Sequence, residues 1–147
     1  MSNLTTPFWE QFNGHLKGML RWSQLDDLWQ QVRAKPLGWY VAQLGQNVPE
    51  APLDEAALLR FIDEADALLR REHQHDYCGI VFADVPAQPQ FIKIFDPHNL
   101  GSACSHGSTP IMPLWVMSRM RPERLEAPAP QPSSRSNWWS RLFGKGL

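Results

Sequence analysis

The sequence predicts an α+β domain in which three helices pack on one face of a small, mainly antiparallel sheet of three to four strands, followed by a disordered C-terminal tail. Three observations support this fold class. Apolar residues recur at helical spacing in the N-terminal half, short β-branched and aromatic runs separated by turn residues follow, and Pro, Ser and Ala dominate after Arg119. A chain of 147 residues is long enough to form one domain with its own core.

The first two helices are predicted before residue 36. Thr6 can cap a helix that has Pro7 at its first position and extends to near Arg21. Ser23 can cap a second helix, which should stop before Pro36 because the residue before a proline is disfavoured in the helical conformation. The apolar stripe of the first helix is Phe8, Phe12, Leu16, Met19 and Leu20, and that of the second is Leu25, Leu28, Trp29 and Val32.

The third helix has the most consistent signals. It starts near Pro52, carries Asp54 and Glu55 in its first turn and ends with Arg70 and Arg71. Acidic residues at the start and basic residues at the end of a helix both interact favourably with its dipole. We therefore expect an amphipathic helix whose apolar stripe is Leu58, Phe61, Ile62, Ala65, Leu68 and Leu69.

Four short runs are predicted as strands. Residues 77–83 and 91–95 are predicted to form a hairpin across a proline-containing turn, and residues 111–118 a third strand. The aromatic run 37–44 is a further candidate strand. A loop rich in Gly and Ser, from 96 to 109, precedes the third strand, and loops of this length often carry function.

Composition limits the class of protein. A net charge of −1 supplies no field that would attract nucleic acid, so no nucleic-acid partner is expected. No segment approaches the roughly 18 apolar residues that span a bilayer, and no secretory signal is recognisable. Two widely separated cysteines indicate free thiols in a reducing compartment, which favours the bacterial cytoplasm. Residues 1–125 are expected to form the globular domain, 126–137 a Pro/Ser-rich linker and 138–147 a short amphipathic tail.

One candidate site lies in and around the loop. Cys78, His98, Cys104 and His106 are the residue types that bind zinc tetrahedrally, although their spacing matches no compact zinc motif. Alternatively, Cys104 could act as a nucleophile, with His106 or His98 as the base and Asp96 to orient the base. Cys78 can equally be a small buried hydrophobic residue.

The tail is the other candidate site. Its aromatic and aliphatic residues fall on one face of a short helix, while its basic residues supply positive charge. Such a segment can dock in a partner's groove, lie on an anionic membrane surface, or fold back on its own domain or remain loose. The predicted contact residues are Trp138, Trp139, Arg141, Leu142, Phe143 and Lys145.

The sequence therefore favours a non-catalytic accessory protein, without a cofactor, that docks through this tail to a partner protein or to the inner membrane surface. The alternative is a small zinc-binding or cysteine-dependent protein acting through Cys78, His98, Cys104 and His106.

Overall fold

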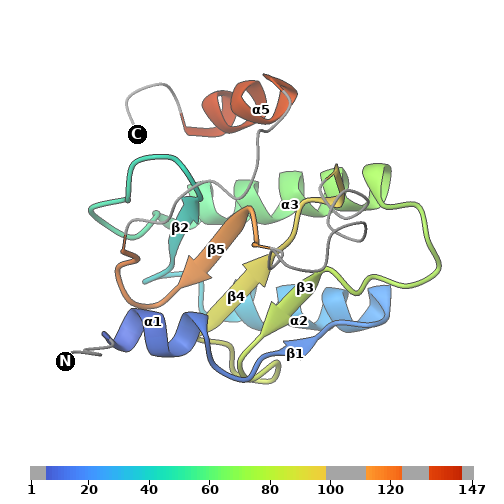
Figure 1. The fold of residues 1–147 in the computed structure, drawn as a ribbon, viewed down its shortest axis with the longest axis horizontal. Coiled ribbons are helices and arrows are strands. Elements are labelled where there is room, and N and C mark those ends of the chain that lie inside the picture. The colour runs from blue at the N-terminus through green and yellow to red at the C-terminus, as the bar shows by residue number, and fades with distance from the viewer. Residues whose placement is uncertain (1–5, 99–111, 124–132, 144–147) are drawn as a thin grey trace.

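A computed structural model describes residues 6–98, 112–123 and 133–143. The described chain folds around one antiparallel five-stranded sheet with the strand order β1-β3-β4-β5-β2 (Figure 1). The strands are β1 (Lys17–Gly18), β2 (Tyr40–Gln43), β3 (Val81–Ala83), β4 (Phe91–Ile94) and β5 (Trp115–Ser118). The predicted α+β class and the hairpin of β3 and β4 are confirmed, and the run 37–44 does contain a strand.

Helices lie on both faces of the sheet, whereas the sequence predicted three helices on one face. Helices α2 (Trp22–Ala34) and α3 (Glu55–Glu72) cover one face, and α1 (Pro7–Phe12) covers the other (Figure 1). The reason is that β4 and β5 are apolar on both faces. Ile92 and Met117 join the core under α2 and α3, whereas Phe91 and Val116 pack with Phe8 of α1.

The first helix is shorter than predicted. Thr6 caps α1 as expected, but the helix ends at Phe12, and Lys17 and Gly18 form the edge strand β1. Gly18 packs so closely on Phe82 that a Cβ atom there would lie 2.9 Å from the ring. Pairing of residues 17 and 18 with β3 therefore replaces the C-terminal part of the predicted first helix. Leu20, which was expected on the apolar stripe of that helix, is 64% exposed.

Helix α3 confirms the most secure prediction. The Asp54 side chain caps it by accepting a hydrogen bond from the backbone N–H of Ala57 at 2.8 Å, and the whole predicted apolar stripe is buried. No helix among the described residues is long and apolar enough to cross a bilayer.

The C-terminal region differs from the predicted disordered tail. Residues 133–143 form helix α5 (Ser133–Phe143), which packs beside α3 (Figure 1). Trp138 and Trp139 of this helix belong to the same apolar core as Trp115 and Phe61. The C-terminal helix is thus part of the folded unit, because its aromatic side chains complete the core over the end of β5.

Candidate interaction site

An ion-pair cluster, in which Arg135 and Asp96 are buried and Glu72 is partly exposed, holds α5 against the rest of the chain. Arg135 is 3% exposed, and its Nε and Nη2 atoms donate to the two carboxylate oxygens of Asp96 at 2.9 and 2.8 Å. Its Nη1 and Nη2 atoms also donate to Glu72 at 3.2 and 2.5 Å. Burial alone would lower the pKa of Arg135, but the hydrogen bonds and charges of the two carboxylates outweigh it and raise the pKa above its usual value. The guanidinium therefore stays charged in the interior.

Three elements supply this cluster. Glu72 is the last residue of α3, Asp96 lies two residues after the end of β4, and Arg135 lies in the first turn of α5. Asp96 also accepts a hydrogen bond from the backbone N–H of His98 at 2.8 Å, which fixes the chain as it leaves the sheet. Since both carboxylate oxygens of Asp96 accept from Arg135, this residue acts as an anchor for α5.

Aromatic packing forms the second part of the attachment. The Trp138 ring lies 5.2 Å from that of Trp115 and 6.1 Å from that of Phe61, measured between ring centroids. Phe143 packs on Trp139 at 4.5 Å and on Phe61 at 6.2 Å. Trp138 and Trp139 are only 4% and 6% exposed, so the two residues expected to reach a partner are largely covered by their own domain.

A groove remains open beside the docked helix. It has a volume of about 640 Å³ and separates α5 from residues 47–53, which follow β2. Trp139 and Phe143 form one wall, Val48 and Leu53 contribute to the other, and Arg121 lies in the lining. We call this space the α5 groove. Its volume falls in the range of sites that accept side chains or small ligands, roughly 300–1,000 Å³, and such sites are also lined mainly by apolar residues.

The predicted tail residues have different positions in this arrangement. Trp138 faces the core, Trp139 and Phe143 line the α5 groove, and Arg141 is exposed. Leu142 packs partly buried against the core, and Lys145 lies outside the described residues. On the single helical face read from the sequence, Trp138 attaches the helix, whereas Trp139 and Phe143 both pack in or against the core and line the α5 groove.

Only two of the four predicted zinc ligands fall among the described residues. Cys78 is fully buried, whereas His98 is exposed in the segment after β4, and no hydrogen bond or ring contact joins these two described residues. Burial raises the pKa of the Cys78 thiol, which disfavours the thiolate that zinc binding requires. Cys104 and His106 lie outside the described residues, and within the described ranges no group of three or more His, Cys, Asp or Glu side chains could hold a metal ion.

The cluster around Arg135 was not predicted, although the sequence contains one signal for it. Arg135 precedes Trp138, Trp139 and Leu142 by three, four and seven residues, which places a charged residue on the apolar face of the helix. A charge at such a position needs a buried partner when the face is covered. Nothing in the sequence identifies Asp96 and Glu72 as those partners, because they come from distant segments.

The described chain is thus a small α+β domain whose C-terminal helix is bound in its own core and borders an open apolar groove. No protein-family description, curated protein or solved structure matches the chain.

Proposed function

We propose that the chain is a non-catalytic interaction protein that docks to a partner protein through the C-terminal helix and the groove beside it. The observation that carries this proposal is the α5 groove, about 640 Å³ in volume and lined by Trp139 and Phe143 of the helix itself. Aromatic side chains at the edge of a concave, apolar surface are the usual anchors of protein interfaces. Trp138 and Arg135 keep the helix in position, and Trp139 and Phe143 border the groove.

The charges around the α5 groove indicate the kind of segment that it would accept. Arg121 lines the groove and is exposed, as is Arg141 of α5. Arg60 of α3 is also exposed and donates to the backbone carbonyl of Arg141 at 3.3 Å. Glu50 is the acidic residue in the lining. The lining itself holds one guanidinium group, Arg121, and one carboxylate, Glu50. The exposed Arg60 and Arg141 on the adjoining helices add positive charge, so we expect a partner segment that carries acidic residues beside an apolar side chain.

The burial of the two tryptophans supports a protein partner over a lipid surface. Membrane attachment by a short helix depends on aromatic side chains that enter the headgroup region. Trp138 and Trp139 are 4% and 6% exposed, so little of either ring is available to a flat surface. A side chain of a partner can enter the groove without disturbing the buried contacts of Arg135.

Site-specific photocrosslinking in cells tests the proposal on the full chain. With p-benzoylphenylalanine in place of Phe143, we expect one discrete adduct whose yield falls several-fold in the variants Arg121→Glu and Arg141→Glu. The same group in place of Tyr77, which is 56% exposed on another part of the surface, is the matched control. The captured protein, once purified, should bind the wild-type chain and bind the charge-reversed variants more weakly. Identical adducts from both positions, or no adduct from position 143, would overturn the proposal.

Vesicle flotation distinguishes a protein partner from a membrane. We expect the chain to bind vesicles rich in phosphatidylglycerol no better than neutral vesicles at about 0.15 M salt, where exposed charges are largely screened beyond about 8 Å. If the wild-type chain instead binds anionic vesicles strongly, and the variants Arg121→Glu and Arg141→Glu do not, the docking surface is the inner membrane rather than a partner protein.

A further inference from the structure

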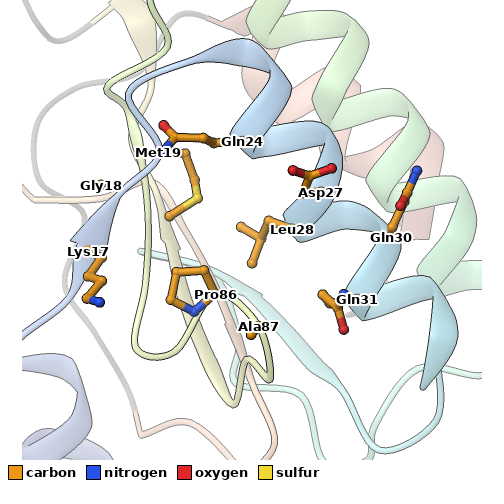
Figure 2. Close-up of a pocket in the computed structure, with 10 residues that line it drawn as sticks. All are labelled: Lys17, Gly18, Met19, Gln24, Asp27, Leu28, Gln30, Gln31, Pro86 and Ala87. Atoms are coloured by element: carbon orange, nitrogen blue, oxygen red, sulfur yellow. The ribbon is translucent and has the colours of Figure 1, made fainter.

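A second pocket lies in the part of the molecule formed by β1, α2 and the turn between β3 and β4. It has a volume of about 410 Å³ and is bounded by the edge strand on one side and the helix on the other (Figure 2). The helix α5 packs on α3 and does not line this pocket. The site is therefore separate from the α5 groove and does not depend on the function proposed for it. Its lining consists of Lys17, Gly18, Met19, Gln24, Asp27, Leu28, Gln30, Gln31, Pro86 and Ala87.

The middle of the pocket is apolar. Figure 2 shows the side chains of Met19, Leu28 and Pro86 grouped between the strand and the helix. Met19 and Leu28 are 3% and 1% exposed and belong to the main core, so the edge of the core forms the floor of the pocket. An apolar group of a ligand placed here would be removed from water, which stabilises the complex by about 25 cal/mol for each Å² of apolar surface buried.

Opposite charges stand on the two walls. Lys17 projects from β1 and Asp27 from α2, on opposite sides of the apolar surface (Figure 2). Neither side chain forms an ion pair or a hydrogen bond with any other described residue, whereas most other acidic residues of α2 and the facing helix α3 are paired, such as Asp26 with Arg70. Both charges are thus available to a ligand.

Amide side chains complete the rim. Gln31 lies on α2 beside Asp27, and Gln24 lies one turn before it. The Oε1 atom of Gln24 accepts a hydrogen bond from the backbone N–H of Arg21 at 2.9 Å. The NH₂ group of Gln24 is therefore the part of the amide that can donate to a ligand. Amide groups both donate and accept, so they match the N–H and C=O groups of a peptide backbone.

We propose that this pocket binds a short peptide with free termini and apolar side chains. The C-terminal carboxylate pairs with Lys17, the N-terminal ammonium pairs with Asp27, and an apolar side chain rests on Met19 and Leu28. A peptide fits better than a single α-amino acid because Lys17 and Asp27 lie on opposite walls with Met19 and Leu28 between them (Figure 2), whereas the two charges of an amino acid are attached to one carbon atom. Gln24 and Gln31 hydrogen-bond to the peptide group between them.

Titration of the isotope-labelled full chain with leucyl-leucine tests this site by nuclear magnetic resonance. We expect saturable shifts at Lys17, Met19, Asp27 and Leu28, and a dissociation constant near or below about 1 mM. The dipeptide amide and the N-acetyl dipeptide, which each lack one charge, should bind about two- to five-fold more weakly, the range expected for a solvent-exposed ion pair. Free leucine should bind more weakly than the dipeptide.

Charge-neutralising variants test whether Lys17 pairs with the C-terminal carboxylate of the peptide and Asp27 with its N-terminal ammonium group. In Lys17→Gln, the free dipeptide and its amide should bind equally, and in Asp27→Asn the free and N-acetylated dipeptides should bind equally. Glu64→Gln and Arg71→Gln, which change exposed charges on α3, are the matched controls and should leave all affinities unchanged. Ala87→Trp, at an exposed position of the lining, should block binding without unfolding the chain.

Three results would overturn the proposal. They are the absence of saturable shifts at these residues up to 10-fold above about 1 mM, equal affinity of wild-type chain for the free and blocked peptides, and unchanged binding in Ala87→Trp. None of these three results affects the function proposed for the α5 groove, because the residues of the second pocket do not line that groove.

Discussion

Arg135 and Asp96 form a two-point ion pair in which the two side chains are only 3% and 0% exposed. The pair joins the first turn of α5 to the segment just after the central strand β4. Buried ion pairs contribute little net stability when they form, but the loss of one partner is expensive because the other charge remains buried. The position of α5 therefore depends on an ion pair in which the loss of either charged side chain would destabilise the fold.

The substitution Arg135→Met should strongly destabilise the chain. It leaves the Asp96 carboxylate buried without its charge partner, which costs about 3–5 kcal/mol in comparable cases. Urea unfolding followed by tryptophan fluorescence measures this loss. Arg141→Met, on the exposed side of the same helix, is the matched control and should change the free energy of unfolding by less than about 0.5 kcal/mol. Equal stability of Arg135→Met and the wild type would show that the cluster does not hold α5.

The substitution Trp138→Ala tests the aromatic part of the attachment. The ring fills the space between Phe61 and Trp115, so its removal leaves a cavity in the core. Truncation of a buried tryptophan to alanine costs about 3–5 kcal/mol. Ser136→Ala, at an exposed position, is the control. The same reasoning predicts that the chain truncated after Leu125 unfolds at lower urea concentration than the full chain, because Phe61 and Trp115 lose their cover. Unchanged unfolding of either altered chain would contradict this account.

The local parts of the fold could be predicted because their signals are local. Thr6 with Pro7, and Asp54 at the start of the long helix, define helix starts through contacts within a few residues. The hairpin of β3 and β4 follows from two apolar runs and the turn between them. Each of these predictions depends on spacing that the sequence displays directly.

The parts that could not be predicted depend on contacts between distant segments. Leu16, Met19 and Leu20 continue the spacing of the first helix, yet Lys17 and Gly18 pair with residues 82 and 83 instead. The sequence left several interpretations of the tail open, and it could not identify the partners of Arg135 and Trp138, which attach the helix to its own domain. The pocket beside Lys17 was missed for the same reason, since it exists only because β1 forms opposite α2.

Cys78 should react slowly with iodoacetamide in the folded chain. The thiol is fully buried, and burial raises its pKa, so access and thiolate population are both low at neutral pH. In the variant Cys104→Ser, which leaves Cys78 as the remaining thiol, alkylation monitored by mass spectrometry should be at least 10-fold slower than that of the same chain in urea. Labelling at equal rates would indicate that the strand next to Cys78 opens readily and would restore Cys78 as a candidate ligand.

His73 should make stability fall as the solution becomes acidic. His73 is the C-cap residue of α3 and is 6% exposed, and the Nε2 atom of its side chain lies 2.8 Å from the backbone carbonyl of Cys78. Because a carbonyl only accepts, Nε2 carries the hydrogen. Burial lowers the pKa of His73 from 6.5, the nearby His75 lowers it further, and the hydrogen bond to Cys78 opposes this change in part.

The sign of the effect follows from the lowered pKa. Near pH 6.5 and below, the unfolded chain gains a proton at this position before the folded chain does, so the unfolded state is favoured. Stability is therefore highest above pH 6.5 and is lost as the pH falls through the folded-state pKa, with a slope of up to about 1.4 kcal/mol per pH unit. Urea unfolding between pH 8 and pH 5 measures this slope. His73→Gln keeps an N–H donor for Cys78 but does not titrate, so its curve should be flatter in this window, whereas His75→Gln, at an exposed position, should largely retain the slope. Parallel curves for the wild type and His73→Gln would show that the acid sensitivity arises elsewhere.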